Sequence, residues 1–166
     1  LAELLVGGIY TVGKAFANIV DLVLDPRRIE PRIAGILVAD GSRRTDLMTV
    51  LREVCSPADE ATRKRGLNAF IGECLRFRPV SPALFRACTS DTEVEQKLVT
   101  VLVCTLVQAA NMDPRKFNAP HDFRLDREPG PYLHFGPAGG PHRCLGEHIA
   151  MAELRSWAED NRGRFT

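Results

Sequence analysis

The chain has 166 residues, enough for one domain with a buried core. An apolar content of 45%, a charged content of 26% and a net charge of +1 are ordinary for a soluble globular protein and give no indication of a nucleic-acid partner. Five cysteines, an odd number without paired spacing, favour reduced thiols in an intracellular, cytoplasmic setting over a disulfide framework.

The first 25 residues predict one long helix, because apolar side chains recur at three- and four-residue steps up to Asp25-Pro26. Glu3, Lys14 and Asp21 make this segment too polar for a simple membrane span. The pair Gly7-Gly8 inside the helix costs about 1 kcal/mol per glycine relative to alanine. Such a cost indicates either a close helix–helix contact or a functional role.

Two further helices are expected in the middle of the chain. Thr45 or Asp46 can cap a helix that runs to about Val54. Ser56 is expected to cap the next helix, over residues 58–77, with Pro57 at its first position. The apolar side chains of this helix recur on one face, which consists of Leu67, Phe70, Ile71, Cys74 and Leu75.

Glu73 and Arg76 lie on the helix over 58–77, three residues apart and therefore on one side of it. Taken alone, such a pair is most often a solvated surface ion pair of small energetic value. Beyond the helix, residues 84–89 alternate in the manner of a strand that carries Arg86. Residues 98–107 predict another strand, which can run on into a short helix, although no glycine marks a hairpin turn.

The stretch Phe135–Gly146 joins a turn-forming segment to a cysteine. Six of its twelve positions are proline or glycine, which excludes a helix interior or a central strand. Cys144 precedes a helix expected from Leu145 to about Glu159, and the positive end of that helix favours a thiolate. Such a thiolate is a nucleophile, a redox sensor or a metal ligand. The side chains expected to face inward from this helix are Ile149, Ala152, Leu154 and Trp157.

The segment Gly140-Pro141-His142-Arg143-Cys144-Leu145-Gly146 resembles the heme-binding loop of the cytochrome P450 monooxygenases. In that family the cysteine is the axial thiolate of the heme iron, and its electron donation favours O–O cleavage. The resemblance implies that Cys144 binds the metal, that Gly140 and Gly146 shape the cofactor-binding loop, and that His142 contacts a heme propionate. The family's phenylalanine position is occupied by Pro137, while Phe135 lies two residues earlier, as after a two-residue insertion.

Other segments match the family in the same order along the chain. The family's long helix crosses above the heme with a small-Gly-x-acid-Thr pattern, which implies catalytic roles for Gly8 and Thr11. Tyr10 occupies the position of the acid that helps deliver protons during oxygen activation. Arg86 resembles an arginine that reaches a heme propionate from a strand.

Glu73 and Arg76 resemble the ExxR motif of the family. In the family this pair belongs to a structural ion-pair network behind the heme loop, and Arg127 resembles its third member. An arginine fork suits a buried bidentate contact with a carboxylate. Residues 113–123 also resemble the family's proline- and aromatic-rich meander that precedes the loop.

The resemblance implies a mainly α fold with minor β, in which residues 1–166 form the C-terminal, heme-loop half of a single cytochrome P450-like domain. The implied cofactor is heme b (iron protoporphyrin IX), held through the Cys144 thiolate. The implied reaction inserts one oxygen atom from O2 into an apolar small-molecule substrate. Electrons would come from NADPH or NADH through a reductase or a ferredoxin-type donor.

Two expectations concern parts outside the chain. The absent N-terminal half, or a partner, is expected to cover exposed apolar helix faces. Membrane attachment through a segment ahead of residue 1 stays open.

Alternative functions follow from departures and omissions in the pattern. The tyrosine at position 10 favours a heme-thiolate isomerase of fatty-acid hydroperoxides, as in the domains fused to fungal fatty-acid dioxygenases, because that reaction needs no proton delivery to O2. A non-catalytic truncated remnant or interaction module without heme is a third possibility. A Cys144–His142 nucleophile–base pair lacks an evident orienting group, and a zinc site of His142, Cys144 and His148 lacks an evident fourth ligand.

Overall fold

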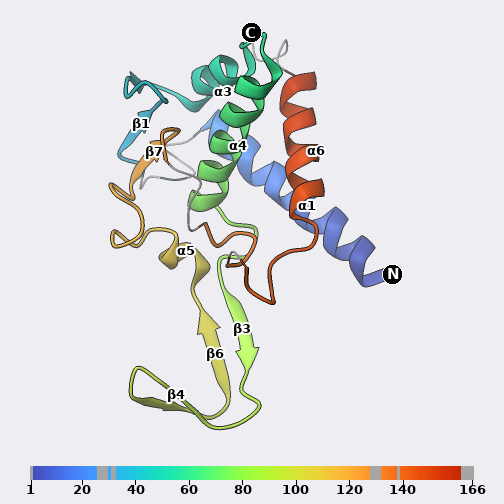
Figure 1. Ribbon diagram of the computed structural model, residues 1–166, viewed down its shortest axis with the longest axis vertical. Helices are drawn as coiled ribbons and strands as arrows, with labels where there is room; N and C mark the ends of the chain where they lie inside the picture. Colours follow the sequence, from blue (N-terminus) through green and yellow to red (C-terminus); the bar gives the residue numbers. More distant parts are fainter. Residues whose placement is uncertain (1, 26–29, 31–32, 128–131, 138, 162–166) are drawn as a thin grey trace.

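The computed structural model describes the chain except for residues 1, 26–29, 31–32, 128–131, 138 and 162–166, and gives no side-chain detail for residues 2–6. The helices are α1 (Ala2–Leu24), α3 (Leu47–Cys55), α4 (Glu60–Phe77), α5 (Val107–Ala110) and α6 (Glu147–Asp160). The strands are β1 (Gly35–Leu37), β2 (Arg43–Arg44), β3 (Leu84–Ala87), β4 (Thr92–Val94), β5 (Lys97–Val99), β6 (Leu102–Thr105) and β7 (Asp122–Arg124). The mainly helical fold with small sheets is the one that the sequence predicts (Figure 1).

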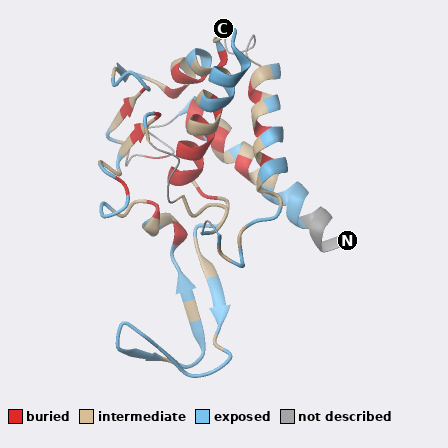
Figure 2. Ribbon diagram, viewed as in Figure 1, coloured by how far each residue is buried: buried red, intermediate tan, exposed pale blue. Residues whose placement is uncertain are grey.

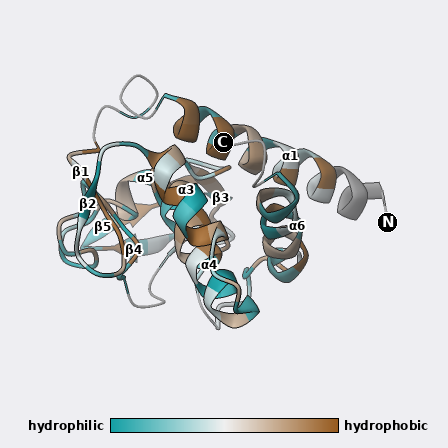
Figure 3. Cartoon of the chain, turned by 90° about the horizontal axis from the view of Figure 1, so that it is seen from above, coloured by the Kyte–Doolittle hydropathy of each residue, from teal (hydrophilic) through white to brown (hydrophobic). Residues whose placement is uncertain are grey.

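Helix α4 lies in the middle of the core (Figure 2). The apolar face predicted for it is buried, and so is Phe77 at its last position. Helices α1, α3 and α6 all contact α4, and α1 runs along one side of the molecule with α4 and α6 on the same side of it (Figure 3). Helix α4 therefore buries the stripe that its periodicity marks.

Aspartate caps determine where two helices begin. The Asp46 carboxylate accepts a 2.7 Å hydrogen bond from the Thr49 N–H at the start of α3, which confirms one of the two predicted caps. The prediction that Ser56 caps α4 was wrong, because Asp59 holds that position and accepts from the Thr62 N–H at 2.7 Å. Ser56 instead ends α3, where its hydroxyl donates to a backbone carbonyl of that helix at 2.8 Å.

The strands of the described residues form three small sheets. Strand β1 pairs with β2 in antiparallel and with β7 in parallel, so it brings residues 35–37 beside residues 122–124. The strand predicted over 84–89 is β3, paired with β6. The segment predicted as one strand over 98–107 is divided among β5, β6 and the start of α5. The β4–β5 turn uses Glu95 and Gln96 at φ 49° and 64° in place of glycine.

The last helix buries a different stripe from the expected one. Leu154 is buried, as predicted, and Trp157 is half-buried in an edge-to-face contact with Phe16, with ring centroids 4.6 Å apart. The prediction that Ile149 and Ala152 face inward was wrong, because both are exposed. The residues of α6 that are buried recur at four-residue steps and are Ala150, Leu154 and Ala158.

Candidate functional site

Glu73, Arg76 and Arg127 are brought together at the centre of the molecule. Glu73 and Arg76 have no exposed side-chain surface, and the arginine fork donates to both carboxylate oxygens at 2.7 and 2.9 Å. Arg127 Nε lies 3.2 Å from Glu73 Oε1, an ion-pair distance without hydrogen-bond geometry. The three charges form a buried ionic cluster whose members depend on one another.

The ionic cluster also binds the backbone of residues 118–122, which precede the cysteine loop in the chain. Arg76 donates to the carbonyls of Pro120 at 2.7 Å and Asp122 at 2.9 Å. Arg127 donates to the carbonyls of Asn118 at 2.6 Å and Ala119 at 2.9 Å. Two arginines therefore hold the backbone over residues 118–122.

The loop that ends at Cys144 is closed by backbone hydrogen bonds. The Cys144 N–H donates to the Phe135 carbonyl at 2.8 Å. Gly136 has φ 85°, and a Cβ there would lie 2.9 Å from the His142 carbonyl oxygen. Gly140 donates its N–H to the Pro137 carbonyl at 3.1 Å. The backbone of Phe135 therefore lies beside that of Cys144, although nine positions separate them along the chain.

Cys144 itself is exposed at the mouth of this loop. A Cβ on Gly146 would lie 3.8 Å from the cysteine Sγ, so the sulfur is bordered there by a residue without a side chain. Arg143 joins the loop to the following helix, because it donates to the Gly136 carbonyl at 3.2 Å and to Glu147 Oε1 at 2.6 Å. The thiol of Cys144 is therefore exposed on a loop whose backbone is held by hydrogen bonds.

Two side chains just ahead of the loop have shifted pKa values. Burial, with the Glu73 carboxylate as the second cause, raises the pKa of Tyr132. Burial, and then the charge of Arg143, lowers the pKa of His134 to about 4. The segment leading into the cysteine loop therefore presents a neutral phenol and a neutral imidazole at ordinary pH.

The other predicted site residues are exposed. Arg86 lies on β3, and its hydrogen bond among the described residues is to the Phe85 carbonyl at 3.0 Å, within its own strand. His142 lies exposed in the loop. Gly8 and Thr11 lie exposed on α1, where the Thr11 hydroxyl donates to the Gly7 carbonyl. Within the described residues, no hydrogen bond or ion pair joins Arg86, His142 or Thr11 to Cys144.

The donor set at Cys144 fits a heme better than a metal ion held by protein alone. Among the described residues no group of three or more His, Cys, Asp or Glu could hold a metal ion, which leaves the zinc hypothesis without a site. A single accessible thiolate suffices for an iron whose other donors come from a porphyrin. Large apolar side chains beside it, Leu145 and Ile149, are 90% and 65% exposed and suit a flat apolar ligand.

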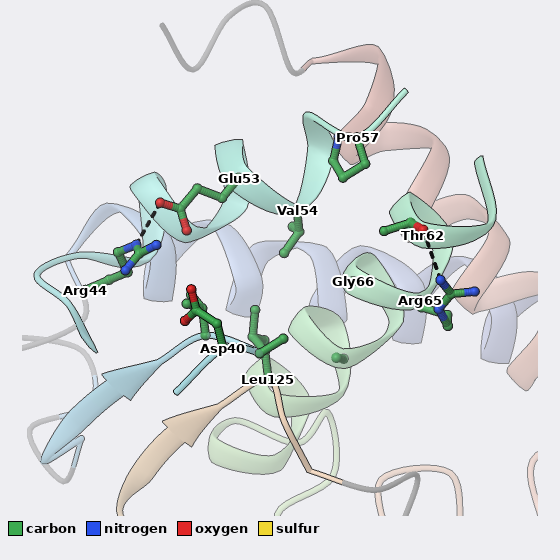
Figure 4. Close-up of a pocket in the computed structure, with 12 residues that line it drawn as sticks. Asp40, Arg44, Glu53, Val54, Pro57, Thr62, Arg65, Gly66 and Leu125 are labelled. Carbon is green, nitrogen blue, oxygen red and sulfur yellow. Dashed lines mark hydrogen bonds and ion pairs between the residues drawn. The ribbon is translucent and has the colours of Figure 1, made fainter. Parts of the chain in front are cut away.

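A separate cavity of about 420 Å³ opens between α3, α4 and the end of β1 (Figure 4). Val54, Gly66 and Leu125 form part of its wall, and the ion pair of Arg44 with Glu53 lies at its side. None of the predicted site residues is among the described residues that line it. The cavity therefore has no part in the site at Cys144.

Sequence reasoning missed three contacts to the ionic cluster. The Tyr132 hydroxyl donates to Glu73 Oε1 at 3.2 Å, and the Arg124 N–H donates to Glu73 Oε2 at 2.9 Å. The fully buried Asn111 accepts from Arg76 through its carbonyl at 3.2 Å. These partners lie 35 to 59 residues away along the chain, at distances that helical or strand spacing cannot reveal.

In the part of the chain that the structure describes, no helix combines the length and the apolarity that a membrane crossing needs.

Comparison with known proteins gives consistent matches. A family model described as "Cytochrome P450" matches residues 44–157. The chain is 34% identical over 143 residues to "Cytochrome P-450 monooxygenase DoxA" of Streptomyces peucetius subsp. caesius, covering 80% of this chain and 32% of that protein. It is 40% identical over 89 residues to "Nocardicin C N-oxygenase" of Nocardia uniformis subsp. tsuyamanensis, covering 51% of this chain and 22% of that protein.

Solved structures match over a longer part of the chain. The heme domain of a P450 from Tepidiphilus thermophilus matches with a TM-score of 0.66 and 25% identity, covering 92% of this chain and 30% of that one. The chain spans between about a fifth and a third of the length of the curated relatives that it matches.

Proposed function

Because this chain belongs to the cytochrome P450 family, we propose that it carries the heme-thiolate site of a monooxygenase, with Cys144 as the axial ligand of heme b. In this proposal residues 1–166 are the C-terminal, heme-loop part of one domain. The observation that carries it is the arrangement of Cys144, an accessible thiol on a loop whose N–H closes onto Phe135 and whose leading segment is held by the buried Glu73 carboxylate.

Each residue has a separate task in the proposed site. Cys144 supplies the thiolate, and the hydrogen bond from its N–H fixes the backbone that presents the sulfur. Gly140 fits the tight loop because a Cβ there would lie 2.9 Å from Pro137 Cγ, and Gly146 leaves the space beside the Cys144 sulfur without a side chain. Glu73 and Arg76 act as scaffold and do not touch the cofactor, because both are fully buried.

Two exposed side chains have the chemistry to bind heme carboxylates. Arg86 has a guanidinium without a carboxylate partner among the described residues, and His142 is exposed two positions ahead of the cysteine. Charge-assisted hydrogen bonds to carboxylates are about twice as strong as neutral ones. We assign both side chains to the propionates.

A bound heme supplies the oxygen activation that inserts one oxygen atom from O2 into an apolar substrate, using electrons from NADPH or NADH through a reductase or ferredoxin-type donor. On the chain's side, Gly8 and Thr11 would line the oxygen face. The Thr11 hydroxyl already donates its hydrogen to the Gly7 carbonyl, so it offers its lone pairs to a water or substrate proton.

A second function is favoured by one residue. Tyr10 is 66% exposed on α1 at the position where the family places a carboxylate. A phenol is a poor proton carrier near pH 7. Isomerisation of a fatty-acid hydroperoxide, whose substrate brings its own oxygen, would not need that carrier. Turnover that proceeds without NADPH, NADH or a reductase would favour the isomerase, whereas strict dependence on reductant would favour the monooxygenase.

The decisive experiment is the absorption spectrum of the natural protein containing this chain, reduced and exposed to CO, for wild type, Cys144→Ser and Cys104→Ser. Cys104 is the matched control, because it is also an exposed cysteine. We expect a thiolate-type Soret band in wild type and Cys104→Ser, and its loss in Cys144→Ser. Absence of any Soret band in wild type would favour a non-catalytic module, and an unchanged band in Cys144→Ser would refute Cys144 as the ligand.

A further inference from the structure

Tyr132 lies directly against the central helix. A Cβ on Gly72 would lie 3.6 Å from Tyr132 Cε2, so the glycine lets the phenol ring contact the helix backbone. Its hydroxyl donates to Glu73 Oε1 at 3.2 Å. The ring also contacts Phe117, with centroids 5.8 Å apart. Tyr132 is therefore fixed by apolar packing and by one hydrogen bond to a buried charge.

That hydrogen bond connects two parts of the site. The other described contacts of the Glu73 carboxylate come from α4 itself, through Arg76, and from Arg124 and Arg127. Tyr132 belongs instead to the segment over residues 132–146 that leads to Cys144. The neighbouring Leu133 N–H donates to Asn111 Oδ1 at 3.1 Å, which attaches the same segment to a second buried residue.

Contacts continue from Tyr132 to the cysteine. The rings of Tyr132 and His134 have centroids 5.3 Å apart, and those of His134 and Phe135 are 4.9 Å apart. The Phe135 carbonyl then accepts the Cys144 N–H at 2.8 Å. His134 Nδ1 is buried without a hydrogen-bond partner among the described residues, so this imidazole serves as packing between two rings. A displacement of Tyr132 would reach Cys144 through three direct contacts.

We propose that Tyr132 is a positioning residue for Cys144, which holds the cysteine loop against the buried Glu73 carboxylate. The proposal rests on the proposed function, because it gives Tyr132 a role toward the heme ligand. The raised pKa of Tyr132 supports it, since the phenol remains a donor over the whole working pH range. Replacement by phenylalanine removes the donor and keeps the ring.

The first test is amide hydrogen exchange of the natural protein containing this chain, prepared without heme. Tyr132→Phe should speed exchange of the Cys144 amide at least tenfold, because the segment that carries Phe135, the hydrogen-bond acceptor of this amide, is then no longer bound to Glu73. Ile71→Val is the matched control, since Ile71 is buried in the core on α4 and its truncation lowers stability while the hydrogen bond of Tyr132 to Glu73 is kept. Equal exchange at Cys144 in wild type and Tyr132→Phe, or equal acceleration in both variants, would overturn the proposal.

The second test follows the heme ligand in the loaded protein. Under mild heating, Tyr132→Phe should convert the reduced-CO spectrum from the thiolate form to the non-thiolate form at least fivefold faster than wild type. Ile71→Val should convert at the wild-type rate when each protein is heated to the same number of degrees below its own midpoint temperature of unfolding. If the wild-type protein shows no Soret band, the proposed function is refuted. If the wild-type protein shows that band and Tyr132→Phe converts at the same rate as wild type, only the role of Tyr132 is refuted.

Discussion

Two groups of site residues differ completely in burial. Glu73 and Arg76 are fully buried and bind one another and the backbone of residues 111–124. Cys144, His142 and Arg86 are exposed. The scaffold behind the loop is therefore buried within the described chain, while Cys144 is exposed and is connected to the scaffold through the loop backbone and the hydrogen bond of Tyr132 to Glu73. Substitutions in the two groups should accordingly separate folding from cofactor binding.

The largest effect is expected from breaking the buried group. Glu73→Gln leaves Arg76 and Arg127 buried without a counter-charge and should lower the free energy of unfolding by about 3–5 kcal/mol in urea titration. Glu53→Gln is the matched control, because Glu53 pairs with Arg44 but is 40% exposed. That control should lose less than about 1 kcal/mol. Similar losses in both variants would show that burial of the cluster contributes no special stability.

A pH effect should come from the segment between the two groups. The pKa of His134 is lowered to about 4 by burial and by Arg143, while an unfolded histidine has its ordinary pKa of about 6.5. Between these values the unfolded chain binds one more proton than the folded chain, so stability falls as pH falls through this window. The loss should approach about 3 kcal/mol at pH 4.

The aspartates of the fold allow this effect to be isolated. Hydrogen bonds from Thr49 and Thr62 lower the pKa values of Asp46 and Asp59 from 3.8, so their contributions are lost only below about pH 4. Chemical unfolding of wild type and His134→Gln at pH 7, 6, 5 and 4.5 measures the difference. If the stability of both proteins changes equally with pH, His134 is not the titrating group.

A smaller effect is expected at the start of α3, which packs on α4. Asp46→Ala removes the acceptor for the Thr49 N–H and should lower the free energy of unfolding by about 1 kcal/mol. Asp46→Asn keeps an oxygen acceptor and should stay within a few tenths of wild type. Thermal unfolding of the three proteins is sufficient, and an Asn variant as unstable as the Ala variant would assign the effect to charge instead of capping.

The buried cluster and the cysteine loop were predictable for different reasons. Cys144 is marked by the glycine and proline residues around it, and this one short stretch is enough to show the resemblance to the heme-binding loop. Glu73 and Arg76 have the spacing of any surface pair, and only the order of segments along the whole chain indicated the third member, Arg127. The contact of Arg127 with Glu73 is a tertiary fact that spacing alone could not give.

Other features were not predicted correctly, in one case because two residues compete for the same role. Ser56 and Asp59 both favour a helix start, and the structure uses Ser56 to finish α3, so the loop between the helices is longer than expected. Ile149 has the periodicity of a core residue but lies beside the cysteine end of α6, where apolar surface is exposed. The hydrogen bond from Tyr132 to Glu73 joins residues 59 positions apart, and no sequence spacing predicts it.

The smallest stability effect and the clearest functional one should coincide at Arg86. Its side chain is exposed and, among the described residues, donates to the Phe85 carbonyl alone, so Arg86→Ala should change the free energy of unfolding of the heme-free protein by no more than about 0.5 kcal/mol. Loss of a propionate contact should still shorten the half-time of heme transfer to an apo-globin acceptor several-fold. Lys97→Ala, another exposed strand cation, should leave that half-time unchanged. A destabilised Arg86→Ala with normal heme retention would place Arg86 in the scaffold and erase the division between the two groups.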